Sequence, residues 1–241
     1  MRYVGVFAHQ DDEMNCLGTL LRLREGGHEV SFVTVTDGGK GLPYDPAATR
    51  QDAAAVRAAE MRTVAEAFAG EHVCLGREDG FVIEDADLRR ELIAVLRTLR
   101  ADVVFTHWTD DYNPDHVLTA KLVADAALFT SLASFCPAGP EPLAGVPRIW
   151  HVDPGPGHGF EATHFVELGN NHVTAKAELI RLHRSQMDVM RTLGGTDYAD
   201  LVAAANRLTG QRLLVSAAEA FRPCLSERRI PWPSDLPGRL S

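Results

Sequence analysis

A histidine and three carboxylates follow one another near the start of the chain, directly after a short apolar segment. The run is Ala8-His9-Gln10-Asp11-Asp12-Glu13, and residues 3–7 precede it. Carboxylates this close raise one another's pKa or share a cation. Imidazole and carboxylate are ligands that suit zinc, and a spare carboxylate can act as a base. A helix cap does not need three carboxylates, so the run indicates a metal site.

A second polar cluster, Asn113-Pro114-Asp115-His116, supplies a further imidazole. Within the first run, His9 and Asp12 are three residues apart and would face the same side of a helical turn. Asp11 projects from the neighbouring position and need not coordinate. Together the two clusters predict a zinc site with three protein ligands and an open position for water.

The apolar pattern around these clusters predicts alternating strands and helices. Strands are expected at 3–7, 30–36, 73–75, 103–106, 149–152 and 164–168, and helices at 14–24, 50–68, 88–99, 116–127, 173–190, 198–208 and 213–221. This order predicts an α/β, Rossmann-like fold with a mostly parallel sheet and helices on both faces. Ligands bind beyond the carboxyl ends of the strands in such sheets, and both clusters follow a strand.

The composition sets limits on size, compartment and partners. The 241 residues, 45% of them hydrophobic, suit a single domain over 1–241, with a proline-rich tail at 231–241 that lies on the surface or is disordered. The net charge of −9 argues against nucleic acid or an anionic membrane as partner. The start of the chain does not resemble a signal peptide, and no apolar run approaches the ~20 residues of a membrane span. The four cysteines are scattered, so we expect free thiols in a soluble, cytoplasmic protein, with a homo-oligomer left open.

The sequence resembles the PIG-L (LmbE-like) family of zinc-dependent N-deacetylases. The family's first motif, Ala-His-Pro-Asp-Asp-Glu, matches residues 8–13, and its second, His-Pro-Asp-His, matches residues 113–116. Weaker matches extend the resemblance over about residues 3–222. They are Thr36-Asp37-Gly38, Arg57-x-x-Glu60, Leu75-Gly76, Asp79-Gly80, Lys176, His183-x-Ser185-Gln186 and Ala218-Glu219-Ala220-Phe221.

The resemblance implies that His9, Asp12 and His116 are the ligands of one Zn²⁺ and that Asp11 is the general base. Zinc with three protein ligands keeps a place for water and lowers its pKa to ~7. Asp11 could take the proton as that water attacks an amide carbonyl, and return it to the leaving amine.

Two positions depart from the family. Gln10 stands in place of the proline, which changes how the loop is held but leaves the ligands intact. Asn113 replaces the first histidine of the second motif, which in the family assists the transition state. An amide can donate a hydrogen bond to an oxyanion but cannot deliver a proton. His158 or His107 could substitute, or Asp11 could carry both proton steps.

Three further positions have both an ordinary and a functional interpretation. Arg57 would by itself form a surface salt bridge with Glu60, whereas the resemblance implies a contact to substrate hydroxyls or an anionic group. Asp79 is either a turn residue or, as in the family, a contact to the sugar. His183 lies four residues before Met187, which favours a packing role.

The leading prediction is therefore an amidohydrolase that removes an acetyl or another small acyl group from an amino sugar or a sugar-containing metabolite. One alternative is a sugar- or nucleotide-binding Rossmann-like module without hydrolysis, but the first strand is not followed by the glycine-rich phosphate-binding pattern. Another is a different zinc hydrolase, such as a phosphodiesterase, which typically uses two metals. The number of metal ions per chain separates these alternatives from the leading prediction.

Overall fold

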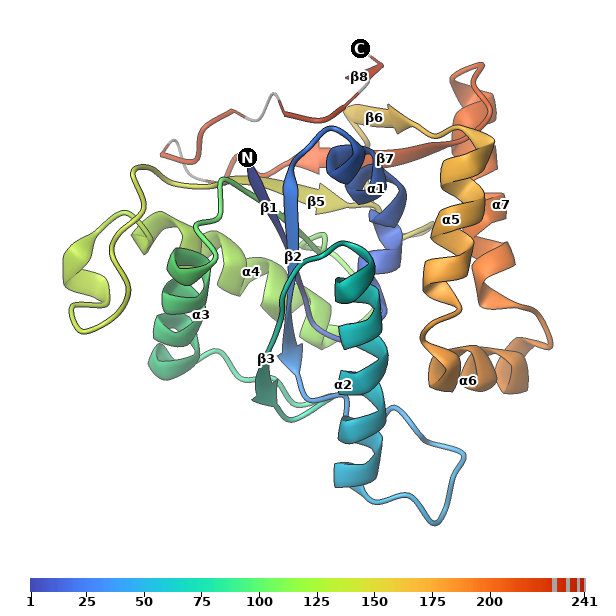
Figure 1. Cartoon of the computed structure of the whole chain (residues 1–241), viewed down its shortest axis with the longest axis horizontal. Helices are drawn as coiled ribbons and strands as arrows, with labels where there is room; N and C mark the ends of the chain where they lie inside the picture. The colour runs from blue at the N-terminus through green and yellow to red at the C-terminus, as the bar shows by residue number, and fades with distance from the viewer. Residues whose placement is uncertain (227–228, 233–234, 238, 241) are drawn as a thin grey trace.

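The computed structural model describes residues 1–226, 229–232, 235–237 and 239–240, and an eight-stranded sheet forms its centre (Figure 1). The strands are β1 (Arg2–Phe7), β2 (Glu29–Thr36), β3 (His72–Arg77), β4 (Val103–Thr106), β5 (Arg148–Val152), β6 (His164–Glu167), β7 (Ala218–Pro223) and β8 (Arg239–Leu240). Their order across the sheet is β3-β2-β1-β4-β5-β7-β6-β8. The first five are parallel, whereas β7 is antiparallel to both neighbours and β8 is antiparallel to β6.

Helices cover both faces of this sheet. They are α1 (Leu17–Glu25), α2 (Arg50–Ala67), α3 (Ala86–Thr98), α4 (Pro114–Phe129), α5 (Asn170–Ile180), α6 (Arg184–Gly194) and α7 (Tyr198–Arg212), with short 3₁₀ helices η1 (Asp12–Asn15) and η2 (Ala133–Phe135). Alternate residues of β1 point to opposite faces. Tyr3 and Phe7 pack with α1, α2, α5 and α7, whereas Val4 and Val6 pack with α3 and α4. The predicted α/β fold with a mostly parallel sheet and helices on both faces is confirmed.

Two predicted helices are corrected by the structure. The helix expected at 173–190 is two helices, because His183 leaves the helical conformation at φ −78° and ψ 62° and α6 begins after it. The helix expected at 213–221 is wrong, because residues 218–223 form β7 between β5 and β6. Ala218 to Phe221 are all buried, so this strand lacks the polar alternation that identifies a half-exposed strand.

The start of the first helix also differs from the prediction. The segment expected to begin a helix at residue 14 forms η1 at 12–15, and α1 starts only at Leu17. The helix expected at 116–127 is confirmed as α4, which begins two residues earlier, with Pro114 in its first turn and the Asn113 side chain accepting a hydrogen bond from the Asp115 backbone N–H at 2.9 Å.

The described part of the 231–241 tail packs against the sheet. Leu236 is buried, the Tyr3 hydroxyl donates to the Asp235 carbonyl oxygen at 3.0 Å, and Arg239–Leu240 pair with β6. Residues 233–234, 238 and 241, for which disorder was one expectation, lie outside the described residues.

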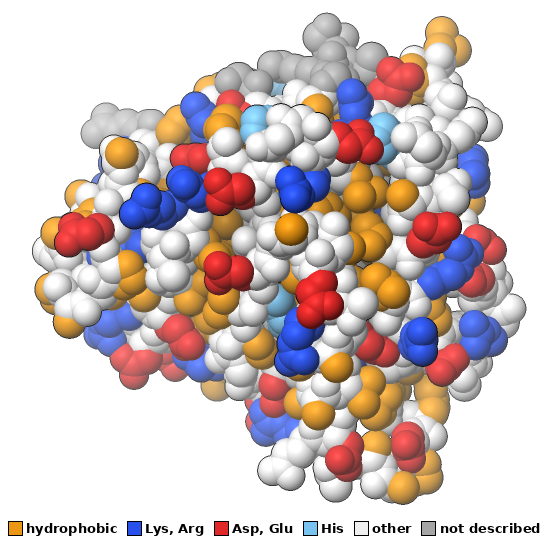
Figure 2. Space-filling view, viewed as in Figure 1, with side chains coloured by type: hydrophobic (Ala, Val, Ile, Leu, Met, Phe, Trp, Pro, Cys, Tyr) orange, Lys and Arg blue, Asp and Glu red, His pale blue; other side chains and the backbone are white. Residues whose placement is uncertain are grey.

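Acidic and basic side chains are interspersed over the face of the molecule shown in Figure 2. Within the described part of the chain, no helix combines the length and the apolar character that crossing a bilayer requires.

Candidate active site

The polar run after β1 turns sharply back on itself. Asp11 has φ 129° and ψ −20°, a backbone conformation that residues with a side chain rarely adopt. Two contacts hold it there. The Asp11 backbone N–H donates to Glu13 Oε2 at 3.0 Å, and Arg57 Nη2 donates to Asp11 Oδ1 at 2.8 Å. Strain of this kind persists only where the surroundings over-determine it, and it is common at functional sites.

Three predicted ligands meet at the carboxyl ends of β1 and β4. His9 Nδ1 lies 3.2 Å from Asp12 Oδ2 and 3.3 Å from His116 Nε2, and His116 Nε2 lies 3.2 Å from Asp12 Oδ1. Donor atoms held ~2.0 Å from a tetrahedral zinc ion are separated from one another by about 3.3 Å. Two imidazole nitrogens and a carboxylate therefore have the chemistry and the spacing to hold such an ion.

The electrostatics of this triad also favour a cation. Burial alone would raise the pKa of Asp12, but His116, His107 and His9 hold it well below its usual range. Burial would lower the pKa of His116, yet Asp12 and Asp111 raise it to about 9. The triad thus attracts positive charge, and a bound divalent ion would take the place of protons on the histidines.

Each histidine of the triad also contacts at least one carboxylate outside the triad. His116 Nδ1 lies 3.0 Å from Asp111 Oδ1. His9 Nε2 lies 3.3 Å from Asp79 Oδ1 and 3.3 Å from Asp115 Oδ2. The structure therefore brings Asp79 to the metal triad. The roles of Asp111 and Asp115 had no signal in the sequence beyond their place near His116.

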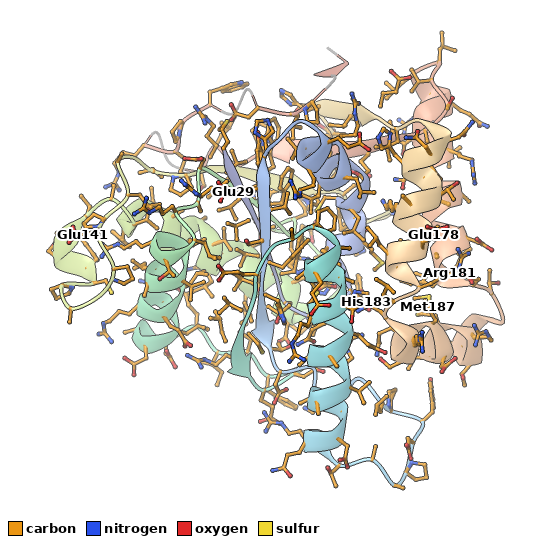
Figure 3. All side chains as sticks on the ribbon, in the orientation of Figure 1. Glu29, Glu141, Glu178, Arg181, His183 and Met187 are labelled. Carbon is orange, nitrogen blue, oxygen red and sulfur yellow. The ribbon has the colours of Figure 1, made fainter. Side chains whose placement is uncertain are left out.

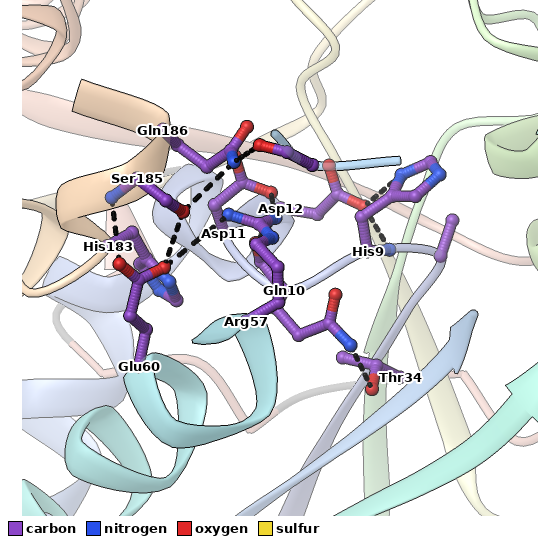
Figure 4. Close-up of polar contacts among 12 residues, drawn as sticks. His9, Gln10, Asp11, Asp12, Thr34, Arg57, Glu60, His183, Ser185 and Gln186 are labelled. Carbon is purple, nitrogen blue, oxygen red and sulfur yellow. Dashed lines mark hydrogen bonds and ion pairs between the residues drawn. The ribbon is translucent and has the colours of Figure 1, made fainter. Parts of the chain in front are cut away.

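Asp11 lies beside the triad, and burial and the Arg57 cation have the largest effects on its ionisation. Burial raises the pKa of Asp11 to about 6, against the opposing effect of Arg57. Figure 4 shows Arg57 beside Asp11. The Arg57 side chain is only 3% exposed and also contacts the Gln10 backbone carbonyl oxygen. Arg57 is thus a buried partner of Asp11 rather than half of a surface salt bridge.

A polar network behind Arg57 ties α6 to the site. Glu60 accepts hydrogen bonds from the Ser185 backbone N–H and hydroxyl, both at 2.7 Å, and lies 4.0 Å from Arg57 Nη1. His183 Nε2 contacts Glu13 Oε1 at 2.6 Å, with both side chains buried. The packing role expected for His183 is therefore corrected: it forms a buried polar link to η1.

The departures from the family motifs are also accommodated. Gln10 is fully buried and its amide donates to the Thr36 carbonyl oxygen at 3.1 Å. Asn113 caps α4 through Oδ1, which leaves its amide N–H groups available at the cavity that it lines.

The two histidines considered as substitutes occupy different places. His107 Nε2 accepts the Ala8 backbone N–H at 2.9 Å, and burial lowers the pKa of this imidazole to about 4. His158 packs beside Tyr112 with ring centroids 6.0 Å apart. Among the described residues, those that line the cavity include Tyr112 but not His158.

The cavity over the triad has a volume of about 270 Å³. Its polar floor holds the predicted ligands and base, and its walls come from the loop after β2, the start of α4, and α6. The lining residues are His9, Asp11, Asp12, Met14, Lys40, Gly41, Pro43, Arg57, Asp79, Tyr112, Asn113, His116, Gln186, Val189, Met190 and Tyr198.

Comparison with known proteins bears on this arrangement. The family model described as PIG-L, GlcNAc-PI de-N-acetylase, matches residues 4–127, more than half of the chain. The chain belongs to the PIG-L family. That match contains both polar clusters, and it confirms the family predicted from the sequence motifs.

Solved structures with the same fold include several deacetylases of the PIG-L type. The N,N'-diacetylchitobiose deacetylase of Pyrococcus horikoshii is 23% identical, with a TM-score of 0.79 over 92% of this chain and 83% of that one. The conserved protein TT1542 of Thermus thermophilus is 26% identical, with a TM-score of 0.76 over 97% and 99%. GalB of Pseudomonas putida, a 4-carboxy-2-hydroxymuconate hydratase, is 18% identical, with a TM-score of 0.79 over 97% and 98%. The prediction of a hydrolase of amide bonds agrees with the family, while the hydratase shows that the fold also serves other chemistry.

Proposed function

We propose that this protein is a zinc-dependent N-deacetylase that removes an acetyl or other small acyl group from the amine of an N-acetylglucosamine-type sugar or sugar-containing metabolite. The observation that carries the proposal is the donor triad of His9, Asp12 and His116 with the Asp11 carboxylate beside it in one cavity. The family match and the deacetylases among the solved structures support the same chemistry.

The metal would supply Lewis-acid polarisation of the amide carbonyl and a lowered pKa for the attacking water. Asp11 accepts the proton of that water as it attacks. Arg57 occupies Asp11 Oδ1, so we assign the proton to Oδ2. The Asn113 amide donates a hydrogen bond to the oxyanion of the tetrahedral intermediate.

The same carboxylate returns the proton to the leaving amine. His107 is poorly suited to this step, because its Nε2 accepts a backbone N–H and its pKa is low. His158 lies next to Tyr112 and does not line the described cavity. We therefore assign both proton steps to Asp11. His158 is the alternative acid for protonation of the leaving amine.

The remaining cavity groups suit a hydroxylated substrate. Arg57 Nε and Nη1 are buried and form no hydrogen bond with any described residue. Arg57 lines the cavity, and we assign it a contact to a substrate hydroxyl or an anionic substituent, as the family resemblance implies. Asp79, which lines the same cavity, is the second candidate for a sugar contact.

The composition supports placing this reaction in the cytoplasm. The cysteines are free in the described structure, and the net charge is −9. The proposed partner is a small molecule rather than a nucleic acid or a membrane.

The test combines metal analysis with product analysis. Protein purified without chelator should hold one zinc ion per chain, and the zinc-loaded protein should release acetate from at least one member of a panel of N-acetylglucosamine derivatives. His116→Ala should lose both the metal and the activity while remaining folded. No bound zinc would exclude the proposal, two ions per chain would favour another zinc hydrolase, and zinc without acetate release would favour a binding module or the hydratase chemistry of the same fold.

A further inference from the structure

His9 presents its two ring nitrogens to two different sets of groups. Nδ1 faces Asp12 and His116, and Nε2 faces Asp79 and Asp115. A neutral imidazole carries one proton, so the nitrogen that offers a lone pair to a metal requires the proton on the other nitrogen. The environment of Nε2 therefore decides whether Nδ1 can bind metal.

Both groups at Nε2 are carboxylates, which when ionised only accept hydrogen bonds. Asp79 Oδ1 and Asp115 Oδ2 each lie 3.3 Å from His9 Nε2. Either can receive the Nε2–H, and neither offers a proton to it. The pair thus enforces the tautomer in which Nδ1 is free for the metal.

Backbone groups of separate segments hold the two carboxylates in place. Asp115 Oδ2 accepts the Gly80 N–H at 2.7 Å and its Oδ1 accepts the Val82 N–H at 3.1 Å. Asp79 Oδ2 accepts the Lys40 N–H at 3.1 Å. Asp115 is 1% exposed, so its position is fixed within the fold.

We propose that Asp79 and Asp115 are a redundant pair of positioning residues that fix the tautomer and orientation of His9 for metal binding. The inference rests on the proposed metal site of His9, Asp12 and His116. Carboxylates behind metal-bound histidines typically change metal affinity by 10–100-fold.

The experiment measures zinc affinity by competition with a chromogenic chelator. The variants are Asp79→Asn, Asp115→Asn and the double variant, with Asp110→Asn, an exposed carboxylate on the β4–α4 connection, as matched control. The double variant, which places amides at both positions, should bind zinc ~10- to 100-fold more weakly than the parent. Each single variant keeps one carboxylate. The product of the two single-variant fold-losses in zinc affinity should therefore be smaller than the fold-loss of the double variant.

A kinetic readout separates positioning from sugar binding. The change in zinc affinity when Asp79→Asn is added to Asp115→Asn isolates the positioning role of Asp79, because zinc affinity is measured without substrate. If adding Asp79→Asn to Asp115→Asn raises only KM and leaves zinc affinity unchanged, the positioning role given to Asp79 is overturned. Melting temperatures of the metal-free variants show whether a loss of affinity comes from a damaged fold, since Asp115 also accepts two backbone hydrogen bonds.

The remaining outcomes are distinguishable. A parent that binds no zinc overturns the proposed function and the inference with it. A parent that binds zinc while the double variant binds it as tightly overturns the inference alone. Two ions in the parent, one of them lost in the double variant, would show that His9, Asp79 and Asp115 ligate a second ion, and would also overturn it.

Discussion

Asp11 is the residue at which backbone strain, burial and the Arg57 cation act together. Its positive φ turns the side chain toward the cavity, and its neighbours Gln10 and Asp12 point elsewhere, to β2 and to the metal triad. Burial raises its pKa to about 6, which is closer to the working range of a general base than an ordinary aspartate. Arg57 limits that rise and keeps one carboxylate oxygen in place.

The first prediction follows from this division of roles. Asp11→Asn should retain zinc and lose ~100- to 10,000-fold in turnover, because the amide still accepts a hydrogen bond from Arg57 but cannot take a proton. Zinc content and kcat measured on the same preparation check it. Turnover near that of the parent would show that another group is the base.

The second prediction concerns Asn113. Replacing it with alanine should cost at most the value of one oxyanion hydrogen bond, ~2.7–4 kcal/mol of transition-state stabilisation. Asn113→Ser is the control, because serine can still cap α4 but lacks the amide donor, so both variants should lose a similar factor in kcat/KM. A serine variant as active as the parent would mean that only the cap matters.

The competing acid is tested by two further variants. Asn113→His restores the residue that the family has at this position. If this variant is strongly more active and its pH profile gains a new alkaline limb, the site of the parent is a less active form of the family's site. If His158→Ala lowers kcat with retained zinc, the loop histidine takes part in the proton transfer and Asp11 does not act alone.

At the scale of elements, the first turn of α6 is fastened to the site at two points. His183, just before this helix, meets Glu13 of η1, and Ser185 meets Glu60 of α2. In Figure 3, His183 lies between α2 and the start of α6. Through these contacts α6 holds its own cavity residues, Gln186, Val189 and Met190, over the metal triad.

The third prediction uses the charge of His183. Burial lowers its pKa, but Glu13 outweighs that effect and the net pKa is raised, so the imidazolium form is favoured in the folded protein. The resulting stabilisation is fully present below the unfolded pKa of ~6.5 and is lost as the pH rises through the higher folded pKa. His183→Gln, which keeps a hydrogen-bond donor without the charge, should therefore be less stable than the parent at pH ~6 and approach it at alkaline pH. Urea unfolding across this range measures the difference, and a constant difference at all pH values would contradict it.

Most elements could be predicted from the sequence because periodicity reflects local burial. Strands β1 to β6 and helix α4 could be predicted from the apolar runs. The error at residues 213–221 arose because β7 is buried on both faces and its alanine-rich sequence resembles a helix. The break at His183 depends on a partner 170 residues away, Glu13, which no local pattern contains.

The same limit applies to the site. Two local motifs were sufficient to predict His9, Asp12 and His116 as a cluster, because β1 and β4 are adjacent parallel strands that end at one edge. The partners of Asp79 and Asp115 could not be predicted, since they depend on how close the β3–α3 connection comes to α4.

For the whole molecule, one buried ion pair joins elements that are far apart in sequence. Glu219 of β7 accepts the backbone N–H groups of Gly18 and Thr19 at the start of α1. Lys176 of α5 donates to the same carboxylate at 2.6 Å and to Asn206 of α7 at 2.7 Å. The pair thus couples the antiparallel part of the sheet to α1, the first α-helix after the polar run at residues 8–13.

The last prediction is that this pair matters for stability through the cost of a buried charge left alone. The Glu219 and Lys176 side chains are 0% and 2% exposed, so Lys176→Met leaves a carboxylate without its cation and should lower the free energy of unfolding by ~3–5 kcal/mol. The double variant Lys176→Met/Glu219→Gln keeps neither charge. Its loss of free energy of unfolding should therefore be smaller than the sum of the losses of the two single variants. Zinc content per folded chain should stay that of the parent, because neither residue lines the cavity. Urea unfolding of the four proteins at saturating zinc measures the coupling, and additive losses would show that the two side chains act independently.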